Sequence, residues 1–314
     1  MVLLIQYTLI FASVLAMVAL GGCFSEHSGV INLGLEGVMV MGALGGALCM
    51  KALSASTLPR ITFVTLIIIA AGLVGVIYSA LLGVACINFR ADQTLVGTAL
   101  NIMAPAVATV IVKAINMSEN PDNVSATVIY GPARKELVQR FYGFQFNWFM
   151  LLAVIAIILA WVILYRTKFG LRLMACGENP QAADSVGINV HKMRWAGVLI
   201  SGLLGGIGGV VYITAGVAEW KFETGVAGFG FLALAVMIFG QWKPVNIGLA
   251  ALLFGFFRAL SNVYSGLPFL ANLKIPGTVY NMMPYIISLI VLAFTSKNSR
   301  APKAEGIPYD KGTR

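Results

Sequence analysis

Long apolar runs separated by short polar connections dominate this sequence. A helix needs about 20 predominantly apolar residues to cross a hydrocarbon core about 30 Å thick. Nine stretches qualify or come close, so we predict an all-α, polytopic membrane protein of about nine transmembrane helices (8–10) in a single domain over residues 1–314. The stretches run approximately over residues 2–23, 29–51, 61–89, 93–114, 147–165, 195–217, 225–240, 245–262 and 278–295.

Composition agrees with this class. The chain is 59% hydrophobic and 11% charged, with a mean hydropathy of +0.88, which is far more apolar than a usual globular chain. Its net charge of +9 does not indicate a nucleic-acid partner, because the Lys and Arg residues lie between the apolar runs, as loop charges of a membrane protein do. The four cysteines are isolated, so neither a metal site nor a disulfide framework is expected.

The polar segment 166–194 sets the predicted orientation. It carries five Lys or Arg residues, and cytoplasmic loops are enriched in these residues. With this segment in the cytosol, alternation of the spans also places the tail 296–314 inside, together with 12 of the 21 basic residues. The N-terminus and the long connection 115–146 then lie outside, where that connection is large enough for a small structured cap or a docking surface.

A short helix is predicted within the basic segment. Asn179 is a good N-cap, Pro180 suits the first helical position, and Gly187 can close the two turns that residues 181–186 provide. Such a helix is only about 10 Å long and would not be stable alone in water. We therefore expect a cytosolic motor subunit to hold it.

Two apolar stretches begin with glycine-rich runs, Ser28–Gly37 and Thr224–Phe231. In the predicted topology they enter the membrane from opposite sides, which is the pattern of an inverted-repeat transporter whose broken helices line the substrate path. Close helix packing also favours glycine in membrane helices. The sequence leaves these two interpretations equally open, and each helix is expected to be bent or broken.

Several polar and aromatic residues within the spans are candidates for a substrate path. A carboxylate facing lipid costs several kcal/mol, so Glu36 should face protein, water or a partner. A path for an uncharged polar solute is one interpretation, and bracing of a kinked backbone or a neighbouring helix is the other; aromatic residues within spans are mostly packing. The candidates are Asn32, Glu36, Gln93, Asn101, Phe229 and Phe231, with Arg258 in the eighth stretch as a further polar group.

The sequence contains no catalytic motif of a familiar enzyme class. It lacks a phosphate-binding Gly-x-x-x-x-Gly-Lys-[Ser/Thr] loop, a Gly-x-Ser-x-Gly elbow and a His-Glu-x-x-His zinc helix. We therefore predict that the chain is not an enzyme, with no catalytic residues, no metal and no cofactor.

Four segments together resemble the permease subunits of bacterial ABC importers. They are Ser28–Gly46, Ala91–Asn101, Gly177–Ala183 and the Met283–Tyr285 motif before the last apolar run. The wider superfamily includes ribose-type and branched-chain amino-acid permeases. The second and fourth segments are most similar to the nucleoside and simple-sugar branch, whose systems use binding proteins of the basic-membrane-lipoprotein type. The resemblance covers nearly the whole chain, although nine spans depart from the ten usual in better-known relatives.

This resemblance implies a type II importer fold with an inverted repeat, in the bacterial cytoplasmic membrane. The implied partners are a cytosolic ATP-binding subunit, a second permease subunit that is often a different chain, and an extracellular substrate-binding lipoprotein, besides membrane lipid. Nucleosides are the implied substrate. The segment 166–194 becomes a cytosolic coupling loop, whose expected contacts with the ATPase are Gly177, Glu178, Asn179, Pro180, Ala182, Ala183 and Gly187.

Other classes remain open at this point. A simple-sugar or branched-chain amino-acid permease would share the same motifs. An ion-coupled secondary transporter would share the inverted repeat but would need no ATPase, and a membrane scaffold or receptor would bind partners without moving solute. The pre-capped short helix in a basic loop favours the ATP-driven importer.

Overall fold

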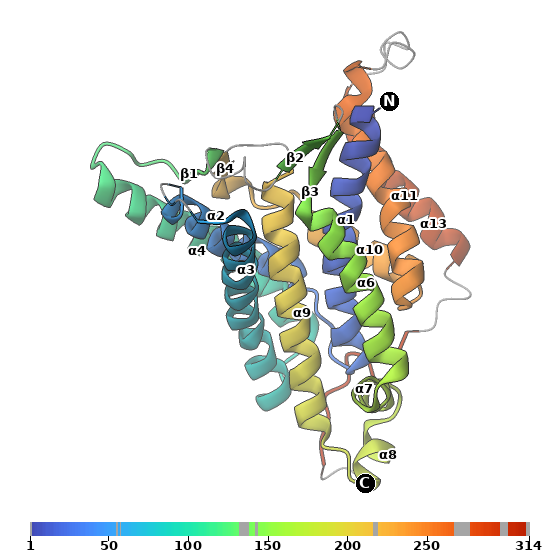
Figure 1. Ribbon diagram of the computed structural model, residues 1–314. Coiled ribbons are helices and arrows are strands. Elements are labelled where there is room, and N and C mark those ends of the chain that lie inside the picture. Colours follow the sequence, from blue (N-terminus) through green and yellow to red (C-terminus); the bar gives the residue numbers. More distant parts are fainter. Residues whose placement is uncertain are drawn as a thin grey trace.

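Figure 1 shows a computed structural model of the chain, which describes residues 2–54, 56, 58–131, 138–141, 144–215, 219–266, 277–295 and 301–311. The α-helices are α1 (Val2–His27), α2 (Leu35–Ala52), α3 (Arg60–Gly83), α4 (Gln93–Glu119), α6 (Trp148–Arg166), α7 (Lys168–Glu178), α8 (Pro180–Ser185), α9 (Val190–Ile213), α10 (Phe229–Phe239), α11 (Pro244–Val263) and α13 (Gly277–Thr295). A π-helical segment η1 (Val84–Asn88) extends α3, and η2 (Phe222–Thr224) and η3 (Tyr264–Gly266) are 3-10 turns.

Four short strands lie in the described parts of the connections between helices. They are β1 (Thr127–Ile129), β2 (Val138–Phe141), β3 (Phe144–Asn147) and β4 (Glu219–Lys221). Strand β1 pairs with β4 in an antiparallel register that sets Val128 opposite Trp220, and β2 pairs with β3 as an antiparallel hairpin. The connection 115–146 is therefore partly ordered by strands, and the predicted all-α class is confirmed for the apolar body of the molecule.

Each of the nine predicted apolar stretches contains a helix in the described part of the chain. Among the described residues, seven helices have the length and hydropathy to cross a membrane: α1, α2, α3 with η1, α4, α6, α9 and α11. Helix α10 has only 11 residues, and the 19-residue α13 contains Pro284. The two glycine-rich stretches differ from the predicted spans, because residues 28–34 and 225–228 form turns and extended backbone before α2 and α10 begin.

Helix α1 forms the centre of the bundle. Every residue from Ile10 to His27 is buried, because α6, α9, α10 and α11 all pack around this helix. The peripheral helices α3, α4 and α6 instead leave large apolar side chains on the surface, such as Ile77 (68% exposed) and Val110 (67% exposed). Exposed apolar faces on long helices suit contact with lipid chains, so the burial pattern agrees with a membrane-spanning bundle.

Glycines allow α2, α3 and α9 to cross with their backbones in contact. A Cβ atom added at Gly42 on α2 would lie 2.2 Å from the Cα atom of Gly206 on α9, and one added at Gly75 on α3 would lie 2.3 Å from the carbonyl oxygen of Gly202. Such small residues let membrane helices approach closely. Close packing, one of the two interpretations of the glycine-rich sequence, therefore applies within α2 itself.

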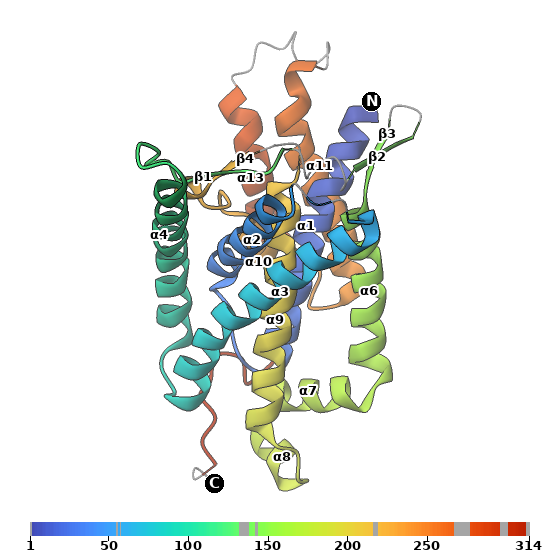
Figure 2. The same cartoon turned by 60° about the vertical axis from the view of Figure 1, so that its left-hand side comes forward.

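The two ends of the bundle carry different elements. Figures 1 and 2 show the N-terminus and the strands at one end, and α7, α8 and the C-terminal segment at the other. Ion pairs tie elements together at each end: Lys51 pairs with Glu119 (2.8 Å) near the strands, and Arg90 pairs with Asp310 (2.7 Å) near α8. The basic segment and the C-terminal tail thus share one end, as the predicted topology requires.

Candidate functional site

Two helices begin inside the bundle and run from there in opposite directions. Helix α2 ends near the strands, where Lys51 pairs with Glu119. The segment that follows α10 reaches the opposite end, where the indole N–H of Trp242 donates to Glu26 (2.5 Å) at the end of α1. The starts of α2 and α10 meet between these ends, which is the arrangement that the inverted-repeat interpretation predicts.

Glu36 joins the two helix starts. Its carboxylate accepts hydrogen bonds from the backbone N–H groups of Gly228 (2.7 Å) and Gly230 (2.6 Å), which lie at the N-terminus of α10. An anion is favoured there, because the first N–H groups of a helix have no partner within it and the helix dipole is positive. Gly228 has φ +80, and a Cβ atom at Gly230 would lie 2.5 Å from the Cα atom of Glu36. Only glycine permits this close approach.

Three predicted path residues brace the non-helical segment before α2. Gln93 accepts from the N–H of Ile31 (2.6 Å), while Asn101 accepts from the N–H of Gly37 (2.8 Å) and donates to the carbonyl of Leu33 (2.7 Å). Asn32 donates to the hydroxyl of Ser201 (2.9 Å). These hydrogen bonds occupy many of the donor and acceptor groups of the three side chains. The amide oxygen of Asn32 and the amide nitrogen of Gln93 have no hydrogen-bond partner among the described residues.

The two predicted aromatic residues lie in different environments. Phe229 is fully buried, with its ring centroid 4.4 Å from that of Tyr212 and 5.1 Å from the guanidinium carbon of Arg258. Arg258 also hydrogen-bonds Tyr212. Phe229 is therefore part of a buried aromatic and cationic cluster, whereas Phe231 is 52% exposed beside the same helix start. A position two residues along a helix faces away, so only Phe231 is accessible to a solute.

A second exposed aromatic residue, which the sequence analysis named only as part of a family motif, contacts the turn before α10. Tyr285 on α13 is 39% exposed, and its hydroxyl donates to the carbonyl of Ala227 (3.1 Å), directly before α10. The Met283–Tyr285 motif was a family signature in the sequence, but its contact with residue 227 spans 58 positions and no local pattern indicates it. Together, Phe231 and Tyr285 give the helix junction an aromatic surface.

The basic segment folds as two short helices. Helix α8 begins as predicted, because the side chain of Asn179 accepts from the N–H of Ala182 (3.0 Å), Pro180 occupies the first position and Gly187 has φ +83. Helix α7 was not predicted. Its N-cap is Thr167, whose hydroxyl accepts from the N–H of Gly170 (3.2 Å). The segment is thus more ordered than the predicted loop with a single helix.

The predicted coupling residues divide into buried and surface positions. Gly177 packs against the end of α1, where a Cβ atom would lie 2.3 Å from the carbonyl oxygen of His27, and Ala183, on the inner face of α8, is 3% exposed. These two residues support the helices from within. A partner can reach the remaining five, of which Pro180 is half-buried and the others are exposed: Glu178, Asn179, Pro180, Ala182 and Gly187.

The C-terminal segment 301–311 is docked on the α7–α8 end rather than free. The N–H of Ala304 donates to the carbonyl of Gly177 (2.8 Å), and Tyr309 packs its ring on His191 with centroids 5.5 Å apart. Lys311 lies 3.8 Å from Asp184 on α8, and Asp310 binds Arg90. The predicted tail 296–314 therefore forms, over its described part, a strap that joins α7, α8, α9 and the connection before α4.

A carboxyl of the strap is half-buried against the bundle. Glu305 shares a hydrogen bond with Glu26, which also accepts from Trp242. A hydrogen bond between two carboxyl groups requires a proton on one of them. Burial raises the pKa of Glu305 to about 7, so the strap carries a group that titrates near neutral pH. Elsewhere in the described ranges, no cluster of three His, Cys, Asp or Glu side chains could hold a metal ion.

The comparisons with known proteins match this architecture over almost the whole chain. The family model for the permease component of branched-chain amino acid transport systems matches residues 4–294. The chain belongs to this permease family. The nucleoside ABC transporter permease protein NupC of Lactococcus lactis is 38% identical over 98% of this chain and 97% of its own length. The guanosine ABC transporter permease protein NupQ of Bacillus subtilis is 39% identical over 99% and 98%.

A more distant relative, the nucleoside ABC transporter permease protein NupB of the same Lactococcus, is 24% identical over 96% of this chain and 82% of its own length. This permease is therefore a multi-pass protein of the bacterial cytoplasmic membrane and a transport component rather than an enzyme. Membership of the family also implies an ATP-binding subunit and a substrate-binding partner.

Proposed function

We propose that this chain is a permease subunit of an ATP-driven importer that moves nucleosides into the cell. The observation that carries the proposal is the full-length similarity to two permeases named for nucleoside and guanosine transport, at 38% and 39% identity. The junction of α2 and α10 supports it, since Phe231 and Tyr285 present aromatic surface on which a planar base can stack.

The second permease subunit is proposed to be a different, longer chain. NupC and NupB come from one organism and carry the same functional description, yet this chain covers 97% of one and only 82% of the other. A transporter whose substrate path is formed between two different permease chains would account for both proteins. The α7–α8 end is proposed to face the cytosol and the strand end to face an extracellular binding lipoprotein, following the excess of basic residues near α7 and α8.

Coupling to ATP hydrolysis is proposed to run through α8. Ala182 on α8 and the exposed residues that flank this helix, Glu178, Asn179, Val186 (75% exposed) and Gly187, would sit in a cleft of the ATP-binding subunit. Closure of that subunit favours one permease state only if it contacts the two states with different free energies. Contacts from α7 and the strap carry the displacement of α8 to α1, α9 and α4.

Reconstitution with purified partners tests the substrate assignment. Proteoliposomes that contain both permease chains, the ATP-binding subunit and the binding lipoprotein are offered labelled guanosine with ATP inside or outside. Uptake is expected only with ATP on the α7–α8 side, and excess unlabelled nucleoside should compete while ribose, glucose and leucine should not. Competition by leucine alone would overturn the nucleoside assignment, and uptake driven by an ion gradient without ATP would overturn the ATP-driven mechanism.

A further inference from the structure

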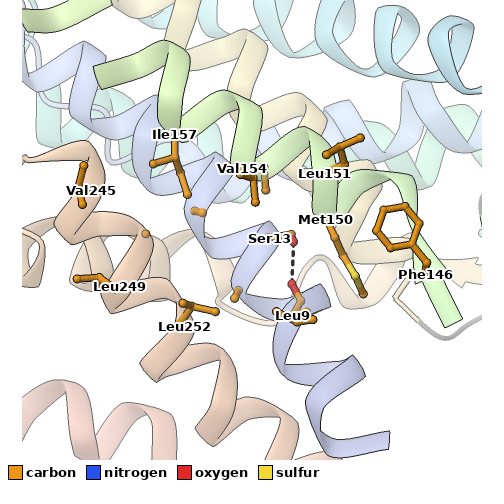
Figure 3. A pocket seen from close by; sticks show the side chains of 14 residues that line it. Leu9, Ser13, Phe146, Met150, Leu151, Val154, Ile157, Val245, Leu249 and Leu252 are labelled. Atoms are coloured by element: carbon orange, nitrogen blue, oxygen red, sulfur yellow. Dashed lines mark hydrogen bonds between the residues drawn. The ribbon is translucent and has the colours of Figure 1, made fainter. Parts of the chain in front are cut away.

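An apolar groove lies on the outer face of the bundle, outside the junction of α2 and α10. Figure 3 shows it between α6 and α11, with α1 as its floor, and its volume is about 540 Å³. Every lining side chain is apolar except Ser13, whose hydroxyl donates to the carbonyl of Leu9 (2.7 Å) within α1. The groove therefore offers hydrocarbon contacts without an unpartnered polar group.

The groove is long enough for part of an acyl chain and too narrow for a helix. It extends from Val245 to Leu252 on α11 and from Met150 to Ile157 on α6, which is about 10 Å at 1.5 Å per residue, against about 15 Å for one leaflet. The walls meet where a Cβ atom at Gly248 would lie 3.0 Å from Ile157. A helix is about 10 Å across with its side chains, so it cannot enter between helices that touch.

A smaller pocket of about 370 Å³, with a mostly apolar lining and a lysine among its residues, continues the groove toward the α7–α8 end. Val245 lines both cavities, and the pocket adds Lys243, Asn246, Trp161 and Tyr165. Lys243 is exposed, and α11 begins directly after it without a side-chain cap on its first N–H groups. Arg166 adds a second cation, with its guanidinium 5.3 Å from the ring of Trp161.

The chemistry of this pocket selects an anionic headgroup. Lys and Arg side chains bind phosphate, the start of a helix favours anions, and Trp and Tyr are enriched at membrane interfaces. None of the residues that line the two cavities in the described part of the chain is acidic. A basic pocket that opens into an apolar groove matches a ligand with an anionic head and a hydrocarbon tail.

We propose that α1, α6 and α11 form a binding site for an anionic phospholipid. One acyl chain lies along Val154, Ile157 and Leu249, and the phosphate lies beside Lys243 at the start of α11. The lipid fills the gap between α6 and α11 and thereby fixes α6, which leads directly into α7 and the segment that contains α8. This site is separate from the junction around Glu36 and does not depend on the identity of the transported solute.

Lipid retention by the assembled transporter tests the headgroup site. The complex is extracted in a mild detergent, incubated with dioleoyl phosphatidylglycerol or dioleoyl phosphatidylcholine, and bound lipid is counted by native mass spectrometry. Retention of the anionic lipid should exceed that of the zwitterionic one. Lys243→Gln should reduce this preference about fivefold, since one basic residue near an anionic surface contributes about 1 kcal/mol. Lys192→Gln, an exposed lysine at the start of α9, should leave it unchanged.

A matched pair of tryptophan variants tests the groove. Val154 (54% exposed) lines it, whereas Leu159 (52% exposed) lies on α6 outside it. Val154→Trp should abolish retention of either lipid, and Leu159→Trp should not; elution as a monodisperse complex shows that both variants fold. Equal retention in the two variants would overturn the proposal. Loss of the second permease from the Val154→Trp complex alone would assign the groove to that subunit and would also overturn it.

Discussion

At the scale of single residues, the hydrogen bonds of Glu36 distinguish two possible roles for a carboxylate within a membrane span. Sequence reasoning left open whether it faces solute or braces structure, and the contacts to the N–H groups of Gly228 and Gly230 favour bracing. In Glu36→Gln, one carboxylate oxygen becomes an NH₂ group that faces an N–H donor. Since an unsatisfied buried donor costs about 1–3 kcal/mol, a clear fall in the unfolding temperature of the purified protein is expected.

The control for this prediction is Glu119→Gln, which removes a partner of the surface pair with Lys51. Exposed ion pairs contribute about 0–1 kcal/mol, so little change in unfolding temperature is expected. Uptake assays separate the two roles further. A Glu36→Gln protein of unchanged stability but with raised KM for nucleoside would show that the carboxylate binds solute rather than α10.

At the scale of elements, the strap 301–311 is expected to dock in a pH-dependent way. The folded-state pKa of Glu305 is raised to about 7 from its usual 4.5, so docking favours the protonated carboxyl. The folded state then binds more protons than the undocked strap between about pH 4.5 and 7, and docking weakens as pH rises through that window. Hydrogen exchange at Ala304, whose N–H donates to Gly177, should accelerate from pH 5 to pH 8 beyond the intrinsic increase.

Glu305→Gln is the matched variant, because an amide can hydrogen-bond Glu26 without titrating. Its protection at Ala304 should follow only the intrinsic pH dependence of exchange. Equal pH dependence in both proteins would show that Glu305 does not control docking.

The helices and the strap also show which parts of the fold can be predicted from the sequence and which cannot. Apolar runs of span length predicted every long helix, and local cap chemistry at Asn179 and Gly187 predicted α8, because these signals need only neighbouring residues. The sequence analysis did not predict α7, because its Thr167 cap lies among basic residues that are typical of a loop. Docking of the strap was missed for a different reason: its partners, Arg90 and Gly177, lie 220 and 127 positions away from Asp310 and Ala304.

At the scale of the whole molecule, the packing connects the α8 surface with the helix junction. Gly177 contacts the end of α1, Glu26 of α1 binds Trp242 after α10, and the start of α10 binds Glu36. These contacts are short and at least partly buried, so we expect a displacement of α8 to be transmitted through them. The two predicted alanines of α8 are not equivalent in this chain of contacts, because Ala183 is buried and Ala182 is exposed.

Ala182→Arg therefore tests coupling without disturbing the fold. The exposed position tolerates the longer side chain, while a docked ATP-binding subunit does not. ATP-dependent nucleoside uptake by the reconstituted complex should fall about tenfold or more, since a loss of 1.4 kcal/mol in contact energy is a factor of ten. The unfolding temperature of the isolated permease should stay unchanged. Ile307→Arg adds the same charge at an exposed position of the strap (56% exposed) and should retain uptake. Normal uptake by Ala182→Arg would remove α8 from the coupling interface and leave the transport role to be explained through another surface of the α7–α8 end.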